Sequence, residues 1–194
     1  RRFPGNMAGM AQGVATSLAI IALAAVACRS FAEAPAAEAM MTARPYLQIE
    51  SVTVDPGRRW VLYLDGVIEP GADRRLMEFV AGQRIARADV YFNSPGGSLL
   101  AGMAIGRVLR ERGFDTHVGR RTADARRPAD GVCYSACPFA YAGGVQRSLR
   151  NGSLLGVHPA RNRVPVPDDA AFDRRVQDDG THYLLEMGVN PDLV

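Results

Sequence analysis

The sequence contains no lysine, because all 23 basic residues among its 194 residues are arginine. This absence excludes mechanisms that need a lysine base, a lysine Schiff base or a phosphate-loop lysine. The arginines exceed the 20 acidic residues and give a formal net charge of +3. They are scattered along the chain, several of them in pairs, without interleaved aromatic residues. This is typical of solvated surfaces, so we expect no nucleic-acid partner.

Cysteine and histidine are scarce, with three of each. Neither their spacing nor their context fits a zinc site, and we expect no metal and no cofactor. Cys28 lies in an apolar run, whereas Cys133 and Cys137 flank Ser135. Four residues apart, these two cysteines can form a disulfide only if the backbone between them is not a regular helix. Two buried thiols are an equally acceptable interpretation.

The first 45 residues differ in composition from the rest. Residues 7–28 carry no charge and follow two arginines, which is typical of an export signal. Small residues at Ser30 and Ala32 predict cleavage after Ala32, although 22 uncharged residues are also long enough for a membrane anchor. We therefore expect residues 1–32 to be a signal or anchor, residues 33–45 a linker, and the location to be periplasmic or otherwise extracytoplasmic.

From residue 46 onward, the hydrophobic pattern alternates between strands and helices. We expect strands at residues 47–54, 60–68, 88–92 and 114–118, and helices at 71–80, 99–112 and 168–187. This alternation predicts an α/β domain with a parallel sheet. Asn151 and Gly152, between short strands at 145–149 and 154–157, predict a β-hairpin.

Two segments depart from this alternation. Residues 120–130 are basic and polar without a hydrophobic period, which predicts a surface loop. Asn190 and Pro191 are typical of the cap and first residue of a helix, and three residues follow them. We therefore expect residues 46–194 to form one α/β domain that is truncated at its C-terminus.

Ser135 lies in a run of small residues from Gly131 to Gly144. Because Pro138 is tolerated only in the first turn of a helix, we place the helix start at Ser135 or Ala136 and expect Ser135 at the N-cap. The N–H of Ala136 can then point at a developing oxyanion. On this segment alone, an ordinary serine cap is the simpler interpretation.

Two further features are expected beside Ser135, because the carboxyl ends of parallel strands meet at one edge of a sheet. Gly96 and Gly97 can turn backbone N–H groups toward an anion or a carbonyl oxygen, although they also suit a tight turn. His158 ends a strand 23 residues after Ser135. A serine and a histidine beside such donors form an acyl-transfer site. The other two histidines, His117 and His182, are better explained by packing or surface roles.

Three segments resemble the proteolytic subunit of the Clp protease and its relatives. Asn93–Ile105 is similar to the oxyanion-hole segment, Cys133–Cys137 to the nucleophile segment, and Gly156–Pro159 to the strand that bears the histidine. The resemblance implies the ClpP/crotonase fold, a spiral of repeated β-β-α units. The two cysteines around the serine, together with a leading export signal, look more like the exported, periplasmic relatives than the cytosolic protease.

The same resemblance implies a role for each candidate site residue. Ser135 would be the nucleophile, His158 the base, and Gly97 and Ala136 the oxyanion donors, with Gly96 in the substrate-binding turn. The family's aspartate lies further beyond the histidine than the 36 residues that follow His158. No catalytic acid is therefore assigned.

The sequence thus predicts an exported serine peptidase that acts on peptides or proteins. No ATPase partner is expected outside the cytoplasm, and a homo-oligomer stays open. Two alternatives remain. One is a catalytically weak or inactive binding protein of the same fold, tethered to a membrane by its N-terminal segment. The other is a crotonase-type acyl-CoA enzyme, which needs the oxyanion glycines but not Ser135 and His158 together.

Overall fold

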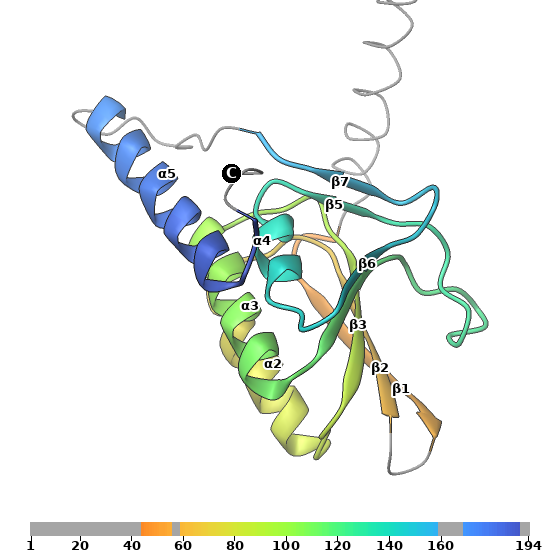
Figure 1. Cartoon of the computed structure of the whole chain (residues 1–194). Coiled ribbons are helices and arrows are strands. Elements are labelled where there is room, and N and C mark those ends of the chain that lie inside the picture. The colour runs from red at the N-terminus through yellow and green to blue at the C-terminus, as the bar shows by residue number, and fades with distance from the viewer. Residues whose placement is uncertain (1–43, 56–58, 159–168, 191–194) are drawn as a thin grey trace, which may run out of the picture. The chain divides into compact units, whose positions relative to one another are not determined.

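The computed structural model describes residues 44–55, 59–158 and 169–190 (Figure 1). The expected signal or anchor, most of the linker and the helix expected from Asn190 lie outside these ranges. Within them, no helix combines the length and the hydrophobicity that a bilayer span requires.

A five-stranded sheet with the strand order β1-β2-β3-β4-β6 forms the centre of the structure. β1 pairs antiparallel with β2, and every other neighbouring pair is parallel. The α/β class with a mainly parallel sheet is therefore confirmed. The strands are β1 (Gln48–Asp55), β2 (Arg59–Asp65), β3 (Ala88–Asn93), β4 (Asp115–Val118) and β6 (Arg147–Leu149).

Helices lie on one side of this sheet (Figure 1). They are α2 (Ala72–Gly82), α3 (Leu99–Arg112), α4 (Cys137–Ala142) and α5 (Asp169–Glu186). The last of them, α5, is packed on the outer side of α3 and α4. The core between sheet and helices contains Leu62, Leu64, Leu76, Val90, Phe92, Ile105 and Leu109, all of them fully buried. Burial of this apolar surface is the main source of stability of the fold.

The prediction of a β-hairpin around Asn151 and Gly152 is wrong. These residues do form a turn, with Gly152 at φ +93°, but the turn joins two different sheets. β6 pairs with β4, whereas β7 (Leu154–Gly156) pairs in parallel with β5 (Val132–Tyr134) in a separate two-stranded sheet. Buried Ser153 explains the change of sheet, because its hydroxyl donates to Val118 O and accepts from Gly131 N at the ends of neighbouring strands.

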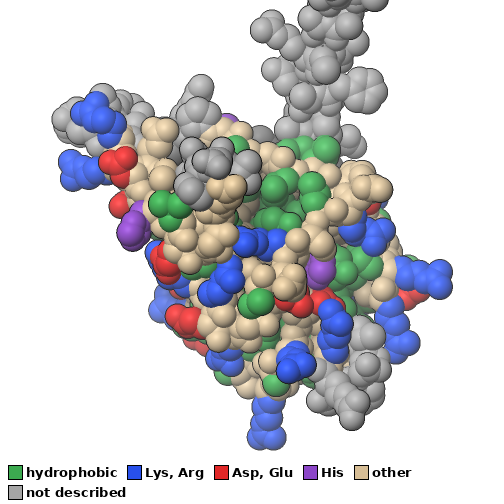
Figure 2. Space-filling model, in the orientation of Figure 1, with side chains coloured by type: hydrophobic (Ala, Val, Ile, Leu, Met, Phe, Trp, Pro, Cys, Tyr) green, Lys and Arg blue, Asp and Glu red, His purple; other side chains and the backbone are tan. Residues whose placement is uncertain are grey.

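The basic segment 120–130 is a surface loop, as expected. Its two ends are joined by hydrogen bonds between Arg120 and Ala129. At its tip, Ala125 O accepts a hydrogen bond from the buried Tyr63 hydroxyl at 2.7 Å. On the face seen in Figure 2, arginine and carboxylate side chains are interspersed rather than arranged in one basic stripe.

α3, α4 and α5 pack closely because glycines lie where their backbones meet. A Cβ at Gly143 would lie 2.5 Å from the carbonyl carbon of Gly106 on α3, and a Cβ at Gly106 would collide with the Tyr183 hydroxyl of α5. That hydroxyl donates to Phe139 O at 2.7 Å, and burial raises the pKa of Tyr183. α4 is therefore held between two longer helices.

We expect Gly143→Ala to lower the free energy of unfolding by about 1 to 3 kcal/mol, because the added methyl group forces α3 and α4 apart. Gly82→Ala is the matched control, since a Cβ there meets no atom within 4 Å. It should leave stability unchanged or raise it by up to about 1 kcal/mol. Urea unfolding of both variants measures the difference, and equal midpoints would contradict this account of the helix packing.

Candidate active site

Ser135 lies in the tight turn between β5 and α4 and has a left-handed backbone, with φ +60°. The expected N-cap role is therefore wrong. Ala136 is the N-cap of α4, and it makes no side-chain cap. Pro138 does lie in the first turn, as expected, but the chain must reverse from strand to helix within two residues. The left-handed conformation at Ser135 makes this reversal, and such a conformation is costly for a residue with a Cβ.

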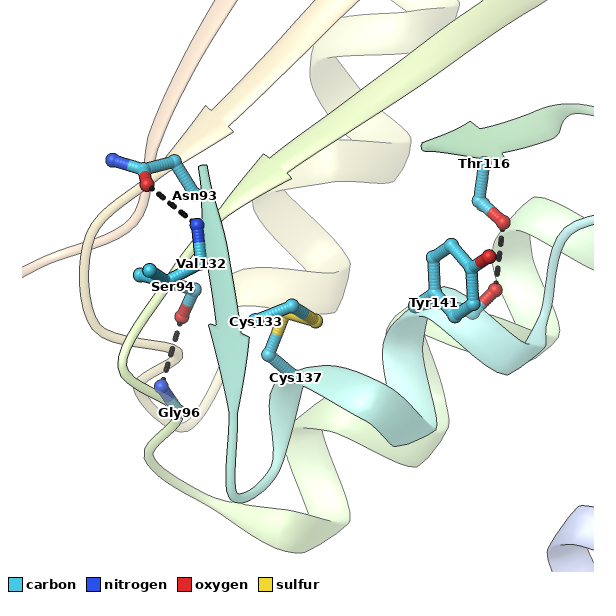
Figure 3. Close-up of a disulfide and its surroundings, with 8 residues drawn as sticks. All are labelled: Asn93, Ser94, Gly96, Thr116, Val132, Cys133, Cys137 and Tyr141. Atoms are coloured by element: carbon cyan, nitrogen blue, oxygen red, sulfur yellow. Dashed lines mark hydrogen bonds between the residues drawn. A yellow bond between two sulfur atoms is a disulfide. The ribbon is translucent and has the colours of Figure 1, made fainter. Parts of the chain in front are cut away.

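A disulfide joins the two residues that flank this turn at equal distances (Figure 3). Cys133 in β5 and Cys137 at the start of α4 are fully buried, with their Cα atoms 5.1 Å apart. The sequence left this bond open, and the strand–turn–helix backbone supplies the non-helical geometry that it needs.

Backbone hydrogen bonds hold the strand side of the turn. Tyr134 N donates to Ser94 O and Ser135 N donates to Gly156 O, both at 3.0 Å. The side chain of Asn93 accepts from Val132 N at 3.1 Å, as Figure 3 shows. β5 is therefore tied to the end of β3 on one side and to β7 on the other.

The glycine turn after β3 lies directly against Ser135. Gly96 has φ +102°, and a Cβ there would lie 2.5 Å from Ser135 Cβ and 3.0 Å from Ala136 N. Its N–H donates to Ser94 Oγ at 3.1 Å (Figure 3). The sequence therefore placed this glycine turn and the serine turn correctly at one edge, and their contact explains why position 96 needs glycine.

Gly97 is fixed by a bridge to Ile68. In that bridge Ile68 N donates to Gly96 O and Ser98 N donates to Ile68 O, so the N–H of Gly97 takes no part in it. Gly97 also has a positive φ, +144°, and no room for a side chain against the Ile68 carbonyl. The turn thus presents a glycine N–H without involving it in the neighbouring strand.

His158 follows β7 at the same edge as Ser135. Tyr134 and Gly156 are paired in the parallel register of β5 and β7, and each chain then leaves its strand. Ser135 is the first residue beyond that pair and His158 the second, on adjacent strands. His158 is exposed. The two site residues thus share one strand pair, although 23 residues separate them in the sequence.

His117 lies in a second cluster on the other face of the main sheet. Its ring stacks on Tyr91 with centroids 4.6 Å apart, Nδ1 is 2.5 Å from Ser148 Oγ, and Nε2 is 3.4 Å from Asp89 Oδ1. Burial raises the pKa of Asp89, but hydrogen bonds from His117 and Arg59 outweigh this and hold its pKa below the usual value. These residues lie on regular strands, so the packing role expected for His117 fits the structure.

The remaining histidine and the acidic residues near it do not form a candidate site. His182 and two nearby acidic residues, Asp178 and Asp179, are exposed on α5, and none is assigned a catalytic role. Among the described residues, no group of three or more His, Cys, Asp or Glu side chains could hold a metal ion.

Comparisons with known proteins find similarity among solved structures. No protein-family model matches the sequence, and no relative is found among curated proteins. Among solved structures, the chain is similar to the ClpP protease catalytic domain from Plasmodium falciparum, with 17% sequence identity, 71% of each chain covered and a TM-score of 0.45.

The left-handed backbone at position 135 gives a stability prediction. We expect Ser135→Gly to be more stable than Ser135→Ala by about 1 kcal/mol, because alanine bears the steric cost of this conformation and glycine does not. Chemical unfolding of the two variants measures the difference. Equal stabilities would mean that position 135 is not left-handed in solution.

Proposed function

We propose that this chain is a serine hydrolase in which Ser135 is the nucleophile and His158 the general base. The left-handed turn at Ser135 carries the proposal. Ser135 is half-buried on a sharp turn between a strand and a helix, and backbone strain of this kind concentrates at functional sites. Its neighbours, a glycine turn and a histidine on the adjacent strand, have the chemistry that acyl transfer requires.

The mechanism assigns one step to each residue. Ser135 Oγ attacks the carbonyl carbon of the substrate while its proton passes to His158. The N–H groups of Gly97 and Ala136 donate hydrogen bonds to the oxyanion that forms. Gly96, for which the sequence suggested substrate binding, lets the glycine turn lie against Ser135. His158 then gives the proton to the leaving group, and water releases the acyl group by the reverse sequence. One oxyanion donor of this kind is worth about 3 kcal/mol of transition-state stabilisation.

We propose peptides or proteins as the substrate class. The resemblance of the serine, glycine and histidine segments to Clp-type peptidases supports this choice. A catalytically weak or inactive binding protein of the same fold is the second candidate. Removing the acid from a known triad lowers kcat by about 10⁴-fold, so reactivity at Ser135 separates the two candidates.

The test is covalent labelling of the full chain by a fluorophosphonate probe, which reacts with activated serines. We expect Ser135→Ala to abolish labelling, and His158→Ala to slow it by a factor of about 10² to 10⁴, the usual contribution of a general base.

Ser148→Ala and His182→Ala are the matched controls, and they should label like the unchanged chain. Full labelling of Ser135→Ala would exclude Ser135 as the nucleophile. A folded but unlabelled wild-type chain would favour the binding protein, and bound or hydrolysed acyl-CoA would favour the crotonase-type enzyme.

We also propose that the protein works outside the cytoplasm. The disulfide supports this location, because such bonds persist in oxidising compartments and are rare in the cytosol of mesophiles. The uncharged residues 7–28 supply the export signal or anchor.

In bacterial cells, we expect the full chain to fractionate with the periplasm or membrane, with Cys133 and Cys137 resistant to thiol alkylation. Alkylation is done on denatured, unreduced protein, because both cysteines are buried in the folded chain. Deletion of residues 1–32 should leave the protein in the cytosol with both cysteines alkylated. The mass added by the alkylating agent reports the difference. Cytosolic recovery of the full chain would rule out export.

A further inference from the structure

We propose that the Cys133–Cys137 disulfide is a positioning device for Ser135, which holds the left-handed turn in which the serine reacts. This inference rests on the proposed function. It makes the reactivity of the serine, rather than the folding of the chain, depend on the oxidation of two cysteines.

The elements on either side of Ser135 are short, and the backbone hydrogen bonds described above hold the turn only on its strand side. β5 has three residues and α4 has six, and the N-cap of α4, Ala136, makes no side-chain cap. Strained backbone persists only where the surroundings over-determine it. The disulfide supplies such a constraint, because it connects the residue two before Ser135 to the residue two after it.

On the side facing α3 and the glycine turn, Ser135 and Ala136 contact the backbone of two glycines, Gly96 and Gly102. Gly96 lies against Ser135, and Gly102 of α3 would place a Cβ 2.5 Å from Ala136 O. These close contacts prevent the turn from moving toward α3, but they do not prevent it from moving away from α3. The disulfide holds it from the core side, where both cysteines pack in the main hydrophobic cluster.

The disulfide contributes little to the stability of the rest of the fold. A disulfide stabilises a protein mainly by closing a long loop in the unfolded chain, and this one encloses five residues. The core residues of β2, β3, α2 and α3 are joined without it. Its effect is therefore local, and a displacement of about 1 Å at a reacting group can cost about a hundredfold in rate.

The experiment measures fluorophosphonate labelling of the full chain carrying Cys28→Ser, so that Cys133 and Cys137 are the cysteines present. The oxidised protein is compared with protein unfolded and refolded in a dithiol. The dithiol reduces the S–S bond to two thiols and is itself oxidised to a cyclic disulfide. The same chain with Cys133→Ala and Cys137→Ala gives a second measurement that needs no reductant.

We expect the reduced chain and the double variant to keep the far-UV circular dichroism of the oxidised chain. Their limiting labelling rate at saturating probe should fall about ten- to a hundredfold, with the half-saturating probe concentration unchanged. Re-oxidation should restore the reduced chain, but not the double variant. Val80→Ala, which removes buried core volume on α2, is the control: it should lower the melting temperature and leave the limiting rate intact.

Equal limiting rates in the oxidised and reduced chains would overturn the inference and leave the proposed function standing. Loss of the folded circular dichroism signal on reduction would also overturn it, because the bond would then support the whole fold. An oxidised chain that is folded but unlabelled would overturn the proposed function, and this inference with it.

Discussion

The contact between Ser135 and Gly96 is the constraint on which the candidate site depends. A side chain at position 96 would overlap Ser135 Cβ, so the end of β3 and the turn before α4 can meet only where one of them has no side chain. That contact fixes the distance between the glycine N–H groups and the serine. The left-handed backbone of Ser135, the disulfide and the pairing of β5 with β7 all lie beside this contact.

Local signals in the sequence predicted the parts of the fold that local forces determine. The bounds of α3 were predicted correctly because Ser98 caps its first turn and Gly113, in a left-handed conformation, ends it. The Asn151-Gly152 turn was also correct as a turn. The hairpin was wrong because a turn signal does not specify which strand pairs with which, and β7 finds its partner in β5 through long-range contacts.

The site was predictable as a set of residues but not as a geometry. Gly96, Ser135 and His158 were expected at one edge because parallel strands bring their ends together, and the structure places them there. The conformation of Ser135 was missed, since Pro138 limits where the helix begins but not how the chain enters it. The disulfide was left open for the same reason, because it depends on the backbone between the two cysteines.

At the C-terminal ends of α4 and α5, arginine makes contacts that lysine would make less well. Arg110 and Arg147 each donate to both Ala142 O and Met187 O, and Arg147 also reaches Gly188 O. One guanidinium has donors in a rigid plane and can serve two helix ends at once, which a compact ammonium group does less well. These two arginines therefore link the C-terminal end of α4, the helix after the serine turn, to the C-terminal end of α5. The use of arginine in place of lysine thus contributes to helix packing in this fold as well as to its charge.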